Sequence, residues 1–111
     1  MESRELSFSP LSVQAQLVRT GVVSPRKLVE NYLERITNLD RKLNAYRVVF
    51  AERALLEADQ AGARAAEGDT RPLLGVPIAI KDDADAAGEV TQVGTSCFDQ
   101  PATADAEAVR R

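Results

Sequence analysis

The strongest pattern of hydrophobic positions predicts a helix over residues 25–39. Ser24 has the side chain of an N-cap, and Pro25 occupies the first helical position. Apolar side chains then recur three or four residues apart, which is the spacing of one helix face. They are Leu28, Val29, Tyr32, Leu33, Ile36 and Leu39. We therefore expect one face of this helix to be buried.

A shorter helix is predicted over residues 11–20, directly before the first. Its apolar side chains share one face, and Ser9 can cap its start with Pro10 at the first helical position. Gly21 is typical of the residue that follows a helix. Because only a few residues join the two helices, we expect them to pack as a helical hairpin over about residues 10–39.

A third helix is predicted over about residues 51–67, where a stripe of Ala and Gly allows another backbone to approach closely. Before it, four residues favour a short strand because they are aromatic or β-branched: Tyr46, Val48, Val49 and Phe50. A last helix is predicted from Ala104, and it has no stop signal before Arg111. We therefore expect residues 1–111 to be an incomplete N-terminal segment of a larger domain.

Residues 73–80 form a nearly continuous apolar run, Leu-Leu-Gly-Val-Pro-Ile-Ala-Ile. A run that is apolar on both faces is typical of a buried strand with a covering layer on each side. We predict a mostly buried core strand over about residues 73–81. Pro77 lacks a backbone donor, so we expect it at an edge, a bulge or the start of the strand.

The apolar run ends abruptly in the charged residues Lys81, Asp82 and Asp83. Ligand sites of α/β sheets lie at the carboxyl ends of strands, and a lysine partly withdrawn from water has a lowered pKa. A neutral amine can accept a proton from a hydroxyl, so Lys81 is the candidate catalytic residue. The alternative is structural: the strand has reached solvent, and the two aspartates are surface partners of the lysine.

Composition excludes several other classes of site. With no His and one Cys, the chain cannot build a Ser-His-Asp or Cys-His catalytic unit or an internal disulfide, and a zinc site is not expected. The absence of Trp, the 5% of aromatic residues and the net charge of -3 argue against nucleic-acid binding. The spacing after Asp83 and Asp85 does not fit a calcium loop, and Cys97 is expected to be a small core residue.

Targeting and membrane signals are not found in the sequence. The first ten residues carry charges and no apolar core of a leader, and no apolar run reaches the length of a membrane span. We expect a cytoplasmic protein that binds neither nucleic acid nor membrane, with no metal and no cofactor.

A resemblance to the amidase signature family is carried by the segment Gly75-Val76-Pro77-Ile78-Ala79-Ile80-Lys81-Asp82, which is similar to the lysine motif of that family. Upstream, Leu43-Asn44-Ala45-Tyr46 resembles another family stretch, and downstream Gly88, Thr91 and Gly94 match family positions. The resemblance implies an α/β fold, a mixed sheet layered by helices, of which this chain is the helix-rich N-terminal part.

The chemistry implied by the resemblance is hydrolysis of a carboxylic amide, or transfer of its nitrogen, by a Ser-cisSer-Lys triad. In that triad a nucleophilic serine attacks the carbonyl, and a bridging serine relays its proton to the lysine. Only the lysine maps onto this sequence, as Lys81. The Gly- and Ser-rich segment that holds both serines is absent, and neither Ser12 nor Ser96 lies in such a context.

Two functions stay open from the sequence. The first is an amidase-type hydrolase that acts on a small-molecule amide and to which this chain contributes Lys81. The second is a catalytically inactive segment that packs against a partner through the Leu28–Leu39 stripe. In either case the apolar faces need a cover, which is a second copy of the chain or a C-terminal portion beyond Arg111.

Overall fold

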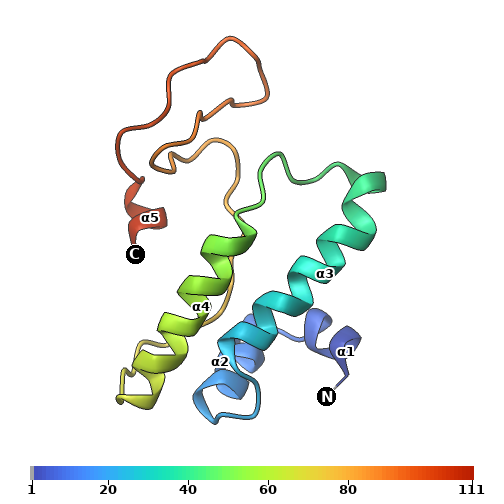
Figure 1. The fold of residues 1–111 in the computed structure, drawn as a ribbon, viewed down its shortest axis with the longest axis vertical. Coiled ribbons are helices and arrows are strands. Elements are labelled where there is room, and N and C mark those ends of the chain that lie inside the picture. Colours follow the sequence, from blue (N-terminus) through green and yellow to red (C-terminus); the bar gives the residue numbers. More distant parts are fainter. Residues whose placement is uncertain (1) are drawn as a thin grey trace. The chain divides into compact units, whose positions relative to one another are not determined.

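The computed structural model describes residues 2–111, and these residues form five helices and no strand. The chain divides into two compact units, Met1–Pro77 and Ile78–Arg111. The first unit holds four helices, which are α1 (Ser3–Phe8), α2 (Leu11–Arg19), α3 (Pro25–Leu43) and α4 (Ala51–Ala66). The second holds α5 (Glu107–Arg110) and otherwise consists of turns and irregular chain. Figure 1 shows α3 and α4 side by side.

The predicted start of α3 is confirmed. The Ser24 hydroxyl accepts a hydrogen bond from the Lys27 backbone N–H at 3.1 Å, and Pro25 is the first helical residue. The helix continues four residues beyond the expected end, through Leu43. Residues 40–42 are polar and add nothing to the apolar stripe, so the sequence pattern did not indicate this last turn. It ends at Asn44, whose left-handed backbone (φ 54°) is typical of a helix terminus.

The N-terminal segment contains a helix that the sequence pattern did not predict. In α1 the Glu2 backbone N–H donates to the Glu5 carboxylate at 3.3 Å, so acidic residues stabilise the helix start. Ser9 ends this helix instead of capping the next one, since its hydroxyl donates to the Leu6 carbonyl at 2.7 Å. The following helix, α2, begins at Leu11, one residue after Pro10.

The core of the first unit lies where α1, α2 and α3 meet. Leu6, Val18 and Leu28 are buried, and Leu28 is fully buried at 0% exposure. The partly buried side chains packed against them are Leu17, Val23, Tyr32 and Val76. Burying one such aliphatic side chain contributes about 1.5–3 kcal/mol, so this small cluster supplies much of the unit's hydrophobic stabilisation.

Two buried polar side chains at the edge of this core have hydrogen-bond partners. Gln14 of α2 donates to the Ser9 carbonyl at 2.9 Å and also bonds the Tyr32 hydroxyl of α3. Asn31 of α3 donates to the Ser7 hydroxyl of α1 at 2.8 Å. These bonds fix how α1 and α2 lie against α3, because an unpartnered buried amide would cost about 1–3 kcal/mol.

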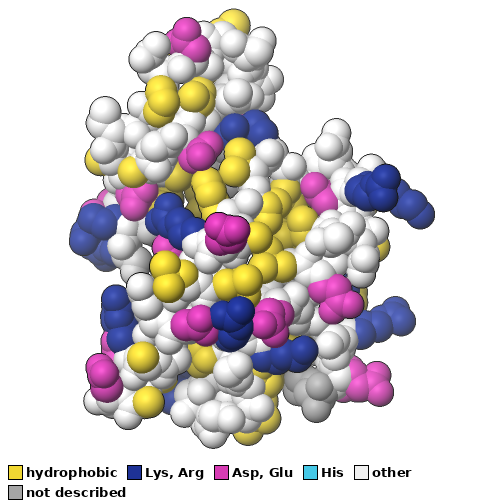
Figure 2. All heavy atoms as spheres, in the orientation of Figure 1, with side chains coloured by type: hydrophobic (Ala, Val, Ile, Leu, Met, Phe, Trp, Pro, Cys, Tyr) yellow, Lys and Arg dark blue, Asp and Glu magenta, His cyan; other side chains and the backbone are white. Residues whose placement is uncertain are grey.

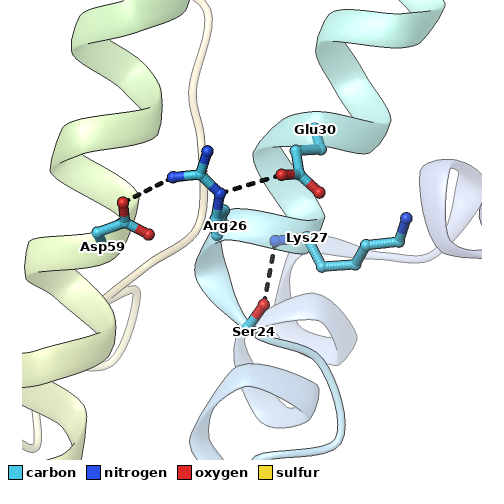
Figure 3. Close-up of polar contacts among 5 residues, drawn as sticks. All are labelled: Ser24, Arg26, Lys27, Glu30 and Asp59. Carbon is cyan, nitrogen blue, oxygen red and sulfur yellow. Dashed lines mark hydrogen bonds and ion pairs between the residues drawn. The ribbon is translucent and has the colours of Figure 1, made fainter.

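An arginine links α3 and α4 (Figure 3). Arg26 lies between two carboxylates, bonding Glu30 of its own helix at 3.0 Å and Asp59 of α4 at 2.6 Å. All three side chains are about half exposed, so the pairs contribute on the order of 0.2–1 kcal/mol each. Figure 2 shows hydrophobic side chains gathered between the two helices, where Ala58 of α4 is buried. Apolar packing and not charge therefore dominates this contact.

A second arginine fixes the turn after α4. The Arg71 backbone N–H donates to the Asp69 carboxylate at 3.0 Å, and the Arg71 guanidinium closes a bidentate pair on the same carboxylate. The side-chain hydrogen bond from Arg71, followed by the backbone one, lowers the pKa of Asp69 to about 2.

No strand is found over residues 73–81 among the described residues, so the predicted core strand is not confirmed. Residues 72–75 form turns, and residues 76–81 have no regular secondary structure and pair with no other segment as a strand. Ile78 is 66% exposed, and Ile80 is also exposed. The physical reason is that a strand is held by ladder hydrogen bonds to a neighbour, and residues 2–111 provide none here. The short strand expected at residues 46–50 is absent for the same reason.

Gly75 sets the direction of the chain at this point. Its φ of +82° lies in the left-handed region, which favours glycine. A Cβ added there would lie 2.6 Å from Pro25 Cγ and 3.1 Å from Val18 Cγ1. The backbone at Gly75 is therefore pressed against α2 and the start of α3, and this contact places Val76 on the core.

Candidate functional site

Lys81 lies near the start of the second unit, directly after the irregular residues 78–80. Its side chain is 86% exposed, and its ammonium pairs with Asp83 at 3.2 Å. The Lys81 carbonyl accepts a hydrogen bond from the Ala84 N–H at 3.2 Å, so the chain turns immediately after the lysine. The motif is thus divided between the units: Gly75 and Val76 pack in the first, and Lys81 and Asp82 begin the loop of the second.

Asp82 closes the loop that follows the lysine. Its carbonyl accepts the Val93 N–H at 2.9 Å, and its carboxylate accepts the Gln92 N–H at 3.2 Å. Two adjacent backbone amides are therefore held by one residue next to Lys81. The Asp82 side chain therefore organises a turn, as a short aspartate side chain often does.

Further along the same loop, Asp85 makes two contacts. Its carboxylate accepts the Thr91 hydroxyl hydrogen bond at 2.6 Å, and its carbonyl accepts the Ala106 N–H at 2.9 Å. Asp105 in turn accepts the Ala87 N–H at 2.7 Å. The aspartates after Lys81 are thus engaged with the protein's own donors, and among residues 2–111 no group of three or more His, Cys, Asp or Glu side chains is arranged to hold a metal ion.

Val93 has an unusual backbone conformation. Its φ of +52° is left-handed, which is costly for a β-branched residue, roughly 1–2 kcal/mol. The hydrogen bond from its N–H to Asp82 and the positive φ of Gly94 (+74°) keep the chain in this turn. Strained residues of this kind persist where the surrounding structure fixes them. Here the strained Val93 is bonded to Asp82, the residue that follows Lys81.

The other residues weighed from the sequence do not join Lys81. Ser12 lies in α2 of the first unit, and Ser96 lies in an irregular part of the second. Cys97 is exposed, so the expectation of a core residue is wrong. The reason is local: Cys97 lies in an irregular segment, with Phe98 also exposed beside it. Among residues 2–111, the Lys81 ammonium pairs with the Asp83 carboxylate, and none of the hydrogen bonds found joins it to Ser96 or Cys97 of the same unit.

Membrane association is addressed by one structural finding. In the described residues, none of the helices has both the length and the apolar character that crossing a bilayer requires.

Comparison with known proteins gives a consistent result. The family model described as Amidase matches residues 27–111. AmiB2 of Mycobacterium tuberculosis, whose name proposes an amidase, is 49% identical over 111 residues, which is 100% of this chain and 24% of the relative. A glutamyl-tRNA(Gln) amidotransferase subunit from Chromohalobacter salexigens is 40% identical over 82 residues, covering 74% of this chain and 17% of that protein.

A solved structure is also similar. It comes from work on a vestigial protein complex and the evolutionary origins of an s-triazine catabolic enzyme, and it aligns with a TM-score of 0.77 and 32% identity. The alignment covers 89% of this chain and 22% of that one. The chain thus spans about a quarter or less of the length of the relatives it matches. The family match over residues 27–111 confirms the sequence prediction: the chain belongs to the amidase signature family.

Proposed function

We propose that this chain supplies the lysine of an amidase-type hydrolase that converts a carboxylic amide and water into a carboxylate and ammonia. The observation that carries the proposal is Lys81, the last but one residue of the family's lysine motif, with its side chain 86% exposed beyond an apolar segment. An exposed amine at such a position is accessible to a hydroxyl contributed by another segment.

The reaction needs two serines in addition to Lys81. The nucleophilic serine attacks the amide carbonyl, and its proton passes through the bridging serine to the lysine amine. The proton returns to the leaving nitrogen as ammonia departs, and water then releases the carboxylate from the acyl-enzyme. Ser12 and Ser96 do not lie near a Gly- and Ser-rich segment, so the proposal places both serines in the portion by which the relatives exceed this chain.

The expected mixed sheet belongs to the same proposal. Residues 78–80 are apolar and exposed, they form neither helix nor turn, and no backbone hydrogen bond holds them among the described residues. An unpaired segment of this kind is a template for a strand from elsewhere. We infer that in a whole amidase domain this segment becomes a sheet strand, with residues 1–111 as the N-terminal part of that domain. A cytoplasmic location is part of this proposal, and it rests on the sequence signals described above.

The alternative, an inactive interaction module, has less support. Its docking surface was the Leu28–Leu39 stripe, but Leu28 and Val29 are buried within the chain itself. Leu39 is 42% exposed, so the C-terminal end of the stripe is the part that can meet a partner.

Amide nitrogen transfer, the activity in the name of the Chromohalobacter relative, uses the same first step and differs in the acceptor of the ammonia.

The test is a chimera of AmiB2 in which the matching quarter is replaced by these 111 residues, with ammonia release from simple aliphatic and aromatic amides as the assay. We expect turnover from the chimera and none from the 111-residue chain alone. Lys81→Ala should lower kcat by roughly 10³-fold or more, because a methyl group cannot accept the relayed proton. The matched control is Lys27→Ala, whose side chain points away from its polar neighbours in Figure 3. Turnover that survives Lys81→Ala would overturn the assignment.

A further inference from the structure

The carboxylate partner of Lys81 lies on a loop that is fastened on both sides of it. Asp83 bonds the lysine ammonium at 3.2 Å. One residue before it, Asp82 holds the N–H groups of Gln92 and Val93, and two residues after it Asp85 holds the Thr91 hydroxyl. The position of the Asp83 carboxylate therefore depends on the two attachments that flank it.

These attachments differ in how easily they can be removed. Asp82 accepts one of these bonds with its backbone carbonyl and the other with its carboxylate, so substitution of its side chain leaves the first in place. The contact between Asp85 and Thr91 joins two side chains, at 2.6 Å, and a single atom change removes it. A hydrogen bond to a carboxylate is stronger than one between neutral groups, so this contact can hold the loop although it is exposed.

A fixed carboxylate at Asp83 has a chemical use in the proposed reaction. Lys81 must lose its proton to act as the base, and it is an ammonium again once it has accepted the relayed proton; the Asp83 carboxylate at 3.2 Å stabilises this protonated state. The aspartate of a Ser-His-Asp triad acts in the same way on the imidazolium, without itself taking the proton. A lysine side chain has many rotamers, so a fixed partner also restricts the direction of its amine.

We propose that Asp85 is a positioning residue: its bond with the Thr91 hydroxyl holds the loop that keeps Asp83 against the ammonium of Lys81. This inference rests on the proposed function of Lys81 for its catalytic meaning. The geometric part, that Thr91 and Asp85 control the pair between Lys81 and Asp83, can be tested without any activity.

The first measurement is NMR of the 111-residue chain, with the Lys81 side-chain signals and the exchange rates of the Gln92 and Val93 amides as readouts. Thr91→Val removes the hydroxyl and keeps the shape of the side chain. We expect it to shift the Lys81 signals toward their values in Asp83→Ala and to accelerate exchange of the two amides roughly 5–30-fold. Thr91→Ser, which retains the donor, should restore both readouts.

The control is Asp99→Ala, which removes an exposed carboxylate of the same unit that bonds the adjacent Gln100 side chain. It should leave the Lys81 signals unchanged. The proposal is overturned if Thr91→Val leaves those signals in place while Asp83→Ala moves them. It is also overturned if Asp83→Ala has no effect on them, since the pair itself would then be absent in solution.

The second measurement uses the AmiB2 chimera. Asp85→Ala should lower kcat on the order of 10- to 100-fold with little change in KM, because the amine is misdirected while the substrate site is untouched. Asp85→Asn retains an oxygen that accepts the Thr91 hydroxyl and should recover most of kcat. If Asp85→Ala leaves kcat unchanged while Lys81→Ala abolishes turnover, the positioning role of Asp85 is refuted and the proposed function stands. If the Lys81→Ala chimera stays active, the proposed function itself is refuted.

Discussion

Substitution of Gly75 by alanine tests why the lysine motif begins with glycine. Two costs add at this position. At φ +82° an alanine loses about 1–2 kcal/mol relative to glycine because its Cβ crowds the carbonyl oxygen. The new Cβ would also lie 2.6 Å from Pro25 Cγ and 3.1 Å from Val18 Cγ1, and overpacking of this kind costs about 1–3 kcal/mol. We expect a total loss of about 2–5 kcal/mol, a large fraction of the stability of a small domain.

Gly68→Ala is the matched control within the same unit. Gly68 has a φ of +92° and no heavy atom within 4 Å of an added Cβ, so it carries the conformational cost without the clash. The assay is thermal unfolding followed by far-ultraviolet circular dichroism, which reports helix content. A loss of 1 kcal/mol lowers the Tm of a domain of this size by about 4–8 °C. Gly75→Ala should therefore unfold at least about 4 °C below Gly68→Ala. Equal melting temperatures for the two variants would refute the close contact between Gly75 and Pro25.

Two further predictions concern the first unit. Leu28→Ala should lower the free energy of unfolding by about 2–5 kcal/mol in urea denaturation, because it empties the fully buried centre of the core, whereas an effect below about 1 kcal/mol would contradict that burial. In an NMR titration, Asp69 should show a pKa of about 2, and Arg71→Ala should move it toward its ordinary value of 3.8. Because the pKa of Asp69 is lowered on folding, the contribution of this pair to stability is complete above about pH 4 and is lost as the pH falls toward 2. An Asp69 pKa at its ordinary value of 3.8 would show that the pair is absent in solution.

The helices were predictable because local signals and burial agree. Ser24 and Pro25 mark the start of α3 in the sequence, and the structure uses both as expected. The end was missed because Asn44 ends the helix by adopting a left-handed conformation. Glycine is the usual residue in this role, and an asparagine in the sequence is a weaker signal of a helix end. The short helix α1 was missed because six residues give no periodic stripe, although Glu2 and Glu5 already carried the acidic signature of a helix start.

The candidate site was predictable as a residue but not as an arrangement. The motif indicates Lys81 as a candidate, and the family match over residues 27–111 spans it, while its catalytic role stays a prediction. The contact between Asp85 and Thr91 depends on a loop whose turns are set by Val93 and Gly94, and a left-handed valine has no sequence signal. The same limit applies to the Asp83 carboxylate, which approaches Lys81 only because the chain turns back at Ala84.

The residues before Lys81 explain why sequence and structure differ most at the strand. An apolar run that is hydrophobic on both faces specifies a need for burial, but the run cannot specify which segment covers it. Ile78 and Ile80 are both exposed in the described chain, and burying a side chain of this size contributes about 1.5–3 kcal/mol. Because Ile78 is 66% and Ile80 42% exposed, covering the remainder of both equals burying about one whole side chain and would add about 1.5–3 kcal/mol, against the roughly 5–15 kcal/mol that stabilises a typical domain. A sheet partner for this segment would consequently be favoured, and its pairing would fix the backbone immediately before the catalytic lysine that we propose.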